Sequence, residues 1–222
     1  MLTTVRRGTP ADRAAAVEVW RAAQAARGQR PPAARVERVA EKVAHAMLVV
    51  ADSPEGLVGM ALGEPGLKGQ TPVPELLHLS MVFVHPSHQR QGVGAELVEG
   101  LADEAWAQGY RNVSVWSGTP EFYEACGFER TTEVDGDTVR LTAELEAPVR
   151  TIVVHSDGIR LGQLLKLAEL VETGSEGKEL LAAGGVEVNG EVEVRRGRQM
   201  VDGDEVRACD QALRVVREVV PA

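Results

Sequence analysis

Residues 86–95, Pro-Ser-His-Gln-Arg-Gln-Gly-Val-Gly-Ala, have the spacing in this sequence that points most directly to chemistry. They follow an apolar, strand-like run at 77–84 and open a strongly periodic helix. A loop of this kind aims several backbone N–H groups at one point, and its glycines let a phosphate approach the main chain. The sequence therefore predicts a phosphate-binding loop, formed by Gln89, Arg90, Gln91, Gly92, Val93, Gly94 and Ala95.

The spacing excludes two better-known phosphate loops. A dinucleotide fingerprint needs a third glycine where Leu97 stands, and a P-loop needs Gly-Lys-Ser/Thr, which this loop lacks. Gln-x-x-Gly-x-Gly after a Val-x-Pro strand end resembles instead the pyrophosphate loop of the GNAT superfamily of N-acetyltransferases. The resemblance implies an α/β (α+β) fold with a mixed central sheet, acetyl-CoA as cosubstrate and an amine as acceptor.

A second motif, Phe-Tyr-Glu-Ala-Cys-Gly-Phe at 122–128, is similar to a GNAT segment whose tyrosine lies beside the cofactor's sulfur. Phe122 and Phe128 are predicted to be core residues of an amphipathic helix, whereas Tyr123 is predicted to be catalytic. A phenol with a pKa of ~10 stays protonated at neutral pH and can give or share its proton with a departing thiolate, whose pKa is ~8.5 in a model thiol.

The strand before the loop is expected to complete the site. In the family this strand carries a bulge and separates from its neighbour, which leaves backbone groups free for the pantetheine arm and for the oxyanion. By position these groups come from Val82, Phe83 and Val84. Candidates for the general base are His78, which alternation places with Val82 and Val84, and Glu75 just before it. A structural role for His78 stays open.

Two further features qualify the resemblance. His85 and His88 stand three apart beside the loop, but no third ligand accompanies them, so we predict a polar loop and no metal. Many relatives carry an asparagine upstream of the Phe-Tyr helix that touches the cofactor. This chain has Trp-Ser-Gly-Thr-Pro at 116–120 instead.

The elements that position these residues follow the GNAT order over about two thirds of the chain. Strands are expected at 2–6, 47–51, 57–62, 76–84 and 112–116, and a closing hairpin turns at 134–137. Two helices are expected between Thr9 and residue 46, separated by a loop at 21–33. Further helices are expected from 93 to a cap at Gly109, and over 120–128. Residues 63–74, rich in glycine and proline, are predicted to be a mobile loop.

The last third of the chain restarts after residue 148 with a strand-like run at 151–155. Leu-Gly-Gln-Leu-Leu-Lys-Leu-Ala at 161–168, Gly-Val-Glu-Val-Asn-Gly at 185–190 and Arg-Arg-Gly-Arg at 195–198 resemble the RNA-binding domain named after ribosomal protein S4. The resemblance covers residues ~150–218 and implies that RNA phosphates meet basic side chains of its two helices and adjoining loop. These are Lys166, Lys178, Arg195, Arg196 and Arg198.

Charge argues against simple RNA binding by this segment. Residues 149–222 contain 10 Lys and Arg against 13 Asp and Glu, a net charge of −3, and Glu176 stands where many relatives have arginine. A degenerate or protein-binding module therefore stays open. Ser175 is predicted to cap the second helix. For the valine-rich hairpin at 186–194 we favour a three-residue connection with a bulge at Gly190, because a two-residue turn sets Val188 opposite Glu191.

Composition bounds the remaining choices. The chain has 222 residues, 44% apolar residues, a net charge of −9 and two widely separated cysteines, and it shows neither a signal core nor a membrane-length apolar run. We expect two domains, 1–147 and 148–222, in a cytoplasmic bacterial protein without membrane contact. Three functions stay open: an acetyltransferase brought to structured RNA or a ribosome, a small-molecule acetyltransferase with a vestigial tail, and a non-catalytic acyl-CoA sensor coupled to an RNA-binding module.

Overall fold

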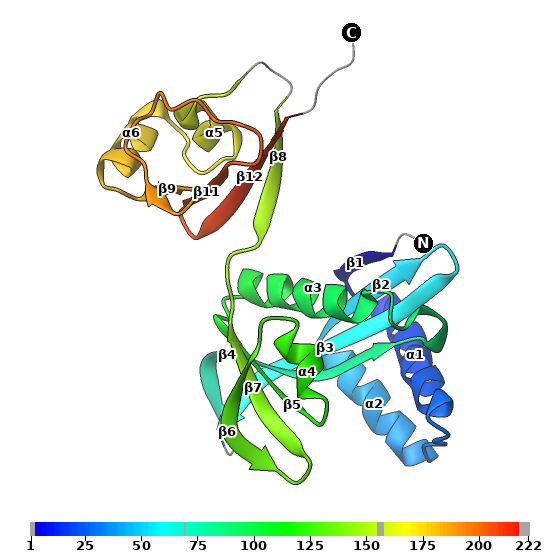
Figure 1. Cartoon of the computed structure of the whole chain (residues 1–222). Coiled ribbons are helices and arrows are strands. Elements are labelled where there is room, and N and C mark those ends of the chain that lie inside the picture. Colours follow the sequence, from blue (N-terminus) through cyan, green and yellow to red (C-terminus); the bar gives the residue numbers. More distant parts are fainter. Residues whose placement is uncertain (1–2, 69, 155–157, 218–222) are drawn as a thin grey trace. The chain divides into compact units, whose positions relative to one another are not determined.

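The computed structural model describes residues 3–68, 70–154 and 158–217 (Figure 1). The chain divides into two compact units, Met1–Glu146 and Ala147–Ala222. Residue 69 of the loop predicted at 63–74 and residue 155 of the strand predicted at 151–155 lie outside the described residues. Within the described ranges, no helix has the length and apolar character needed to cross a membrane.

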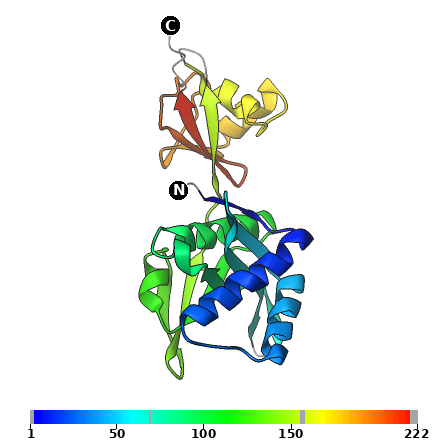
Figure 2. The same ribbon diagram turned by 90° about the vertical axis from the view of Figure 1, so that its right-hand side faces the viewer.

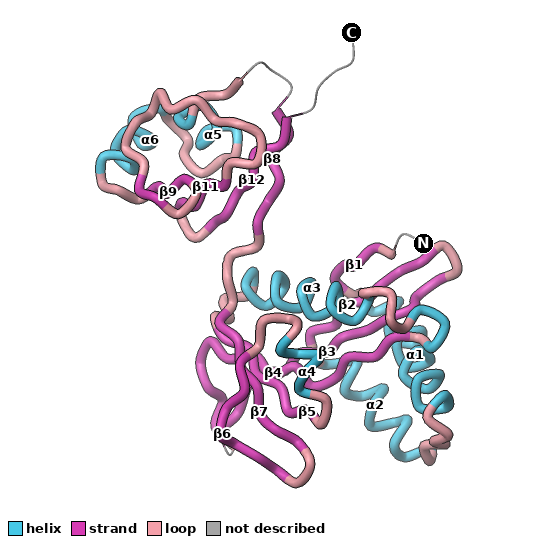
Figure 3. The backbone as a smooth tube through the Cα atoms, viewed as in Figure 1, coloured by secondary structure: helices cyan, strands magenta, loops and turns pink. Residues whose placement is uncertain are grey.

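The first unit is built on a seven-stranded mixed sheet in the order β1-β2-β3-β4-β5-β7-β6 (Figure 3). Only the β4–β5 pair of this sheet is parallel. Its strands are β1 (Thr4–Arg7), β2 (Met47–Ser53), β3 (Gly56–Lys68), β4 (Thr71–Val84), β5 (Asn112–Ser117), β6 (Glu129–Asp135) and β7 (Thr138–Glu144). Its helices are η1 (Pro10–Asp12), α1 (Arg13–Ala26), α2 (Ala33–His45), η2 (Pro86–His88), α3 (Val93–Ala107) and α4 (Pro120–Glu124).

Apolar side chains fill both faces of this sheet. Trp20 of α1 and Val43 of α2 pack with Met60 and Leu62 on one face. On the other face, α3 has an apolar residue at every fourth position, including Leu97 and Leu101. This stripe packs on the sheet together with residues of α4. The sheet therefore separates an α1–α2 face from an α3–α4 face.

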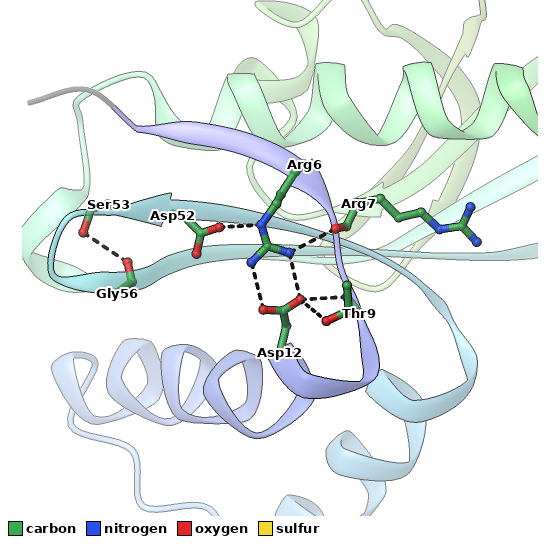
Figure 4. A network of polar contacts seen from close by, with 7 residues as sticks. All are labelled: Arg6, Arg7, Thr9, Asp12, Asp52, Ser53 and Gly56. Atoms are coloured by element: carbon green, nitrogen blue, oxygen red, sulfur yellow. Dashed lines mark hydrogen bonds and ion pairs between the residues drawn. The ribbon is translucent and has the colours of Figure 1, made fainter.

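A polar network joins β1 to the start of α1 (Figure 4). The guanidinium of Arg6 donates to both carboxylate oxygens of Asp12, at 2.8 and 2.9 Å, and its Nε donates to Asp52 of β2 at 2.6 Å. Asp12 also accepts from the backbone N–H and the hydroxyl of Thr9, both at 2.7 Å. Because Arg6 and Thr9 hydrogen-bond its charged form, the pKa of Asp12 lies well below its usual range.

The prediction of a mobile loop at 63–74 is wrong. Residues 63–68 and 71–74 belong to β3 and β4, which form one long hairpin in which Leu67 pairs with Pro72 and a register shift lies between Pro65 and Leu67. The glycines serve close packing instead of mobility: a Cβ on Gly66 would lie 2.5 Å from Cγ of Leu76. The bulge absorbs the irregular pairing that proline imposes on a strand.

A second register shift decides which side chains share a face. Leu62 pairs with Met81 but Gly63 pairs with Leu79, so Ser80 is an extra residue on β4. Such a bulge reverses the in–out alternation of a strand. Leu79 lies in the α3–α4 core, and after the bulge Val82 and Val84 pack there too. His78, adjacent to Leu79, faces the α1–α2 side, so the predicted parity of His78 with Val82 and Val84 is wrong.

The second unit is a five-stranded sheet in the order β10-β9-β11-β12-β8, with two helices packed against it (Figure 2). Its core joins Leu161, Leu164 and Leu165 of the first helix to Val188 and Val206 of the sheet. Its elements are β8 (Val149–Val154), α5 (Leu161–Leu167), α6 (Gly174–Ala182), β9 (Val186–Val188), β10 (Glu191–Val192), β11 (Glu205–Ala208) and β12 (Gln211–Arg217).

The valine-rich hairpin has a two-residue turn, so the predicted three-residue connection is wrong. Val188 pairs with Glu191, and Asn189 and Gly190 both have positive φ, 54° and 82°, as a type I′ turn requires. The mismatch is tolerated because β10 is a two-residue edge strand. Val188 is buried through its other neighbour, β11, where it pairs with Val206.

Helix α6 is capped by Thr173, not by the predicted Ser175. The Thr173 hydroxyl oxygen accepts from the N–H of Glu176 at 3.2 Å, and it donates to the Glu176 carboxylate at 3.1 Å. Thr-x-x-Glu is the capping-box spacing, and its threonine stands two positions before the serine of the prediction. Glu176, which replaces the arginine of many relatives, is thus part of the helix cap.

Candidate functional site

The glycine loop ends in an open helix N-terminus. Gly92 is the N-cap of α3, with a φ of +89°, and its carbonyl accepts from the N–H groups of Ala95 and Glu96. The N–H groups of Val93 and Gly94 donate to no residue in the described ranges. Unpartnered donors at the positive end of a helix dipole are a ready anion-binding site. The predicted phosphate loop thus has the geometry that its chemistry needs.

A side chain at the second glycine would close this cradle. A Cβ on Gly94 would lie 3.3 Å from Cζ of Phe122 and 3.9 Å from a methyl group of Val84. Phe122 was predicted to be a core residue, but 36% of it is exposed and it covers Gly94. Phe128 is buried as predicted. Gly94 and Phe122 therefore bring the glycine loop and α4 together.

Two glutamines hold the loop in shape. The side-chain amide of Gln89 donates to the carbonyl of Val84 at 3.0 Å, and that of Gln91 donates to the carbonyl of Ser87 at 3.1 Å. Arg90 is exposed and has a φ of 60°. The loop is therefore fixed by its own amides, while the Arg90 side chain remains on the surface.

Strands β4 and β5 separate next to this loop. They pair at Leu76–Asn112, Leu77–Val113 and His78–Ser114, and their described pairing ends there although β4 runs on to Val84. The separation and the bulge at Ser80 are the features that the resemblance implied for this strand. They leave an opening in the sheet beside the glycine loop.

The ladder between β3 and β4 decides which backbone groups face this opening. The N–H of His85 donates to the carbonyl of Val58 at 2.7 Å, so these two residues form a hydrogen-bonded pair. From there, non-hydrogen-bonded and hydrogen-bonded pairs alternate along the antiparallel ladder. Val82 and Val84 therefore direct their backbone groups toward the opening, whereas Phe83 directs its own toward Met60. The predicted contribution of the Phe83 backbone is not supported.

Tyr123 lies on the α3–α4 face, where α4 follows β5. It is buried and its ring contacts those of Phe122 and Phe128 edge-on, with centroids 4.9 and 5.6 Å apart. Burial raises the pKa of Tyr123 to about 12. Its hydroxyl has no hydrogen-bond partner among the described residues, yet no buried polar side-chain atom is unpartnered, so this hydroxyl reaches solvent.

His78 lies on the opposite face of the sheet, at a cavity of about 1110 Å³. The cavity has apolar walls from the β3–β4 hairpin and from Trp116, and its polar lining includes His78, Ser114, Glu64 and Arg140. Burial, together with the charge of Lys42, lowers the pKa of His78. The imidazole is therefore neutral at neutral pH and able to accept a proton.

The second candidate base is placed elsewhere. Glu75 is exposed, has a φ of 60° and does not line the cavity. Glu64, which sequence reasoning missed, pairs with His78 across β3 and β4 and forms an ion pair with Lys42 at 2.7 Å. Glu64 lies in the stretch predicted to be a loop, so only its assignment to a strand would have identified it.

The two loop histidines share one hydroxyl. The Nδ1 atoms of His85 and His88 lie 2.7 and 2.8 Å from Oγ of Ser87, and the two ring centroids are 6.5 Å apart. Among the residues that the structure describes, no group of three or more metal-ligating side chains converges. These histidines thus contribute to the polar turn that leads into the glycine loop.

The stretch at 116–120, which lacks the asparagine of many relatives, forms a local turn. The Ser117 hydroxyl oxygen accepts from the N–H of Thr119 at 3.0 Å, and the two hydroxyls lie 3.3 Å apart. Ser117 is buried and ends β5, so its hydroxyl is used to start α4. In this chain a serine–threonine turn occupies the place of the family's asparagine.

In the second unit, an acidic residue offsets two of the predicted RNA-binding arginines. Glu193, whose side chain is 6% exposed, accepts from Arg195 at 2.8 Å and from Arg198 at 3.2 Å. Hydrogen bonds from Arg195, then Arg198, lower the pKa of Glu193 to about 2. Glu193 is therefore buried against the loop that carries these two arginines.

The other three predicted residues present their charge on the surface. Lys166 of α5 and Lys178 of α6 are exposed. Arg196 lies across the two helix starts: a Cβ on Gly162 would lie 2.5 Å from its Cγ, and one on Gly174 would lie 3.0 Å from its guanidinium. The Arg196 carbonyl also accepts from the N–H of Gly162 at 3.0 Å. Arg196 thus combines a surface charge with a structural role in the 195–198 loop.

Comparison with known proteins agrees with this division. A family model of the GNAT acetyltransferase domain matches residues 44–130, and a model of the S4 domain matches residues 152–216. A Bacillus subtilis protein described as probable ribosome maturation protein RlbA is 42% identical over 55 residues, which is 25% of this chain and 78% of that protein.

Solved structures resemble the first unit. A GNAT family acetyltransferase from Brucella melitensis, in complex with acetyl-CoA, has a TM-score of 0.50 at 26% identity and covers 63% of this chain and 87% of its own. The GNAT domain of S. lividans PAT has a TM-score of 0.54 at 18% identity, covering 64% of this chain and 90% of its own. The chain therefore carries a GNAT acetyltransferase domain followed by an S4 domain.

Proposed function

We propose that this protein transfers the acetyl group of acetyl-CoA to an amine held on RNA or on a ribosomal particle, to which the S4 domain binds. The observation that carries the proposal is the opening between β4 and β5. At one end it has N–H donors of α3 that bond to no described residue, and Tyr123 and His78 lie on opposite faces. The reaction fits a bacterial cytoplasm, and both cysteines are free thiols, as is usual in a reducing compartment.

The chain's residues suit acetyl-CoA. The pyrophosphate fits the N–H groups of Val93 and Gly94, where the absence of a Cβ leaves room beneath Phe122. The pantetheine arm fits the opening, where the backbone groups of Val82 and Val84 lie. Because Gln89 already donates to the Val84 carbonyl, Val82 offers the freer polar groups to the arm.

His78 and Tyr123 divide the proton chemistry between the two faces. An amine must be neutral to attack a thioester, and a neutral His78 at the cavity can take a proton from it, directly or through one water. On the other face, the Tyr123 phenol can hydrogen-bond to the departing thiolate. With a pKa of about 12 it keeps its proton more tightly than a thiol of pKa ~8.5, which favours sharing over complete transfer.

The RNA part of the proposal is supported by the S4 domain and by the likeness to RlbA. Lys166, Lys178 and Arg196 offer positive charge that no described acidic residue pairs with. At physiological salt the Debye length is about 8 Å, so such local charges act independently of the domain's net charge.

The test is turnover of acetyl-CoA by the full chain against pools of amines, peptides and aminoacyl compounds, with and without bacterial RNA. We expect turnover that RNA or ribosomal particles increase. Turnover of free amines that RNA does not change would favour a small-molecule enzyme. Acetyl-CoA binding without turnover in any pool would favour a sensor.

A further inference from the structure

Helix α2 carries a row of basic side chains along one face. Arg35, Arg38, Lys42 and His45 follow a 3-4-3 spacing, which places them on one side of an α-helix. They line a groove of about 540 Å³ together with Val39, Glu41, Glu64 and Met81. The row is conspicuous because the whole chain has a net charge of −9.

The charges of this row are only partly offset. Lys42 is paired with Glu64, but Arg38 is exposed and forms no ion pair with any residue in the described ranges. The guanidinium of Arg35 lies 5.9 Å from the centre of the Trp20 ring, which holds it against the helix surface without neutralising it. Two arginines are therefore available to an anionic ligand.

The groove adjoins the cavity at His78. Glu64 lines both, and Lys42 is near enough to His78 to lower its pKa. A chain of negative charges that lay along α2 would thus bring a group attached to it to the cavity, on the face where His78 can accept a proton.

We propose that the groove along α2 binds phosphates of RNA that carries or flanks the acceptor amine. This inference rests on the proposed function and specifies its acceptor: the acetyltransferase domain itself recognises the polyanion next to the amine. RNA is favoured over an acidic polypeptide because the same chain carries an S4 domain. The spacing of Arg35 and Arg38 allows about two phosphate contacts.

The experiment measures the affinity of the full chain for fluorescently labelled bulk transfer RNA and for labelled ribosomal RNA, over a range of salt concentrations. The variants are Arg35→Ala/Arg38→Ala and Arg38→Ala alone. Arg38 makes no ion pair within the described ranges, so its single variant is expected to fold. The matched control is Arg13→Ala/Arg21→Ala, which removes two exposed arginines from α1.

We expect the log–log salt slope to become shallower by about 0.7–0.9 for each α2 arginine removed, with unchanged acetyl-CoA affinity, and no change for the α1 control. If the α2 variants bind RNA as the parent does while Lys166→Ala/Lys178→Ala weakens binding, the α2 proposal is overturned and the proposed function stands. If the parent binds neither RNA, both fail. If poly-L-glutamate binds as well as RNA and the α2 variants lose both equally, the groove recognises acidic polypeptide and the proposal is wrong.

Discussion

His78 and Ser114 form the last residue pair that joins β4 to β5, and the Nδ1 atom of His78 lies 3.5 Å from Oγ of Ser114. Beyond this pair the two strands diverge. The candidate base therefore lies at the point where the sheet opens, and it is held there by both of the strands that form the opening.

Replacing His78 with Gln should lower turnover by on the order of 10²-fold, because glutamine keeps a polar side chain but cannot accept a proton. The folded-state pKa of His78 is lowered, so the active neutral form is lost only as the pH falls below ~6.5. In the parent, kcat/KM should therefore rise with pH through this region, and His78→Gln should lack that limb. An unchanged pH profile in the variant would assign His78 a structural role.

Replacing Tyr123 with Phe should leave acetyl-CoA affinity almost unchanged and lower kcat. The ring and its edge-on contacts with Phe122 and Phe128 are kept, whereas the hydroxyl is removed. We expect a loss of roughly 10²-fold if stabilisation of the thiolate limits turnover. Steady-state kinetics and calorimetric binding test this, and equal kcat for variant and parent would reduce Tyr123 to a core residue.

Replacing Gly92 with Glu should abolish CoA binding, because the new side chain places a negative charge at the anion site. The control is Gly109→Glu at the other end of α3. Both glycines have a φ near +90° and neither has an atom close enough to clash with a Cβ, so both variants carry similar backbone strain. Calorimetry should show CoA binding by the Gly109 variant alone. Equal affinities would contradict the assignment of the loop.

Replacing Arg196 with Ala should weaken RNA binding more than replacing Arg195, because Arg195 is already paired with Glu193. RNA titrations of the full chain measure the difference, and circular dichroism checks the fold, since Arg196 also lies over Gly162 and Gly174. Equal effects would mean that the ion pair opens on binding. Replacing Arg195, Arg196 and Arg198 together with Ala should abolish the contribution of the 195–198 loop to the salt dependence of RNA binding.

Replacing Asp12 with Asn should lower the free energy of unfolding by about 1 kcal/mol, since Asp12 closes the capping box with Thr9 and receives Arg6. Its folded pKa is depressed, so its contribution is present above pH ~4 and is lost as the pH falls further. Chemical denaturation at pH 7 and pH 3 tests this: the difference between parent and variant should shrink at pH 3. Asp137→Asn, in an exposed turn, should behave as the parent at both.

The sequence by itself determined the features that depend on local chemistry. The glycine loop, the helix that it opens and the Phe-Tyr motif were all identified because their glycines, proline and apolar periodicity act over a few residues. The two families followed from the same short motifs, which the family models match. The Asn-Gly turn is also a local signal, and in the fold it outweighs the cross-strand pairing that favours a three-residue connection.

Only the tertiary structure decided which side chains meet. The bulge at Ser80 moves His78 to the face opposite Val82, and alternation in the sequence cannot reveal an extra residue in a ladder. Glu64 reaches His78 because glycines at 63 and 66 allow close packing of a hairpin, a role that composition cannot distinguish from a mobile loop. The pairing of Glu193 with Arg195 and Arg198 likewise depends on how the loop folds back, because net charge does not report which charges lie within hydrogen-bond reach.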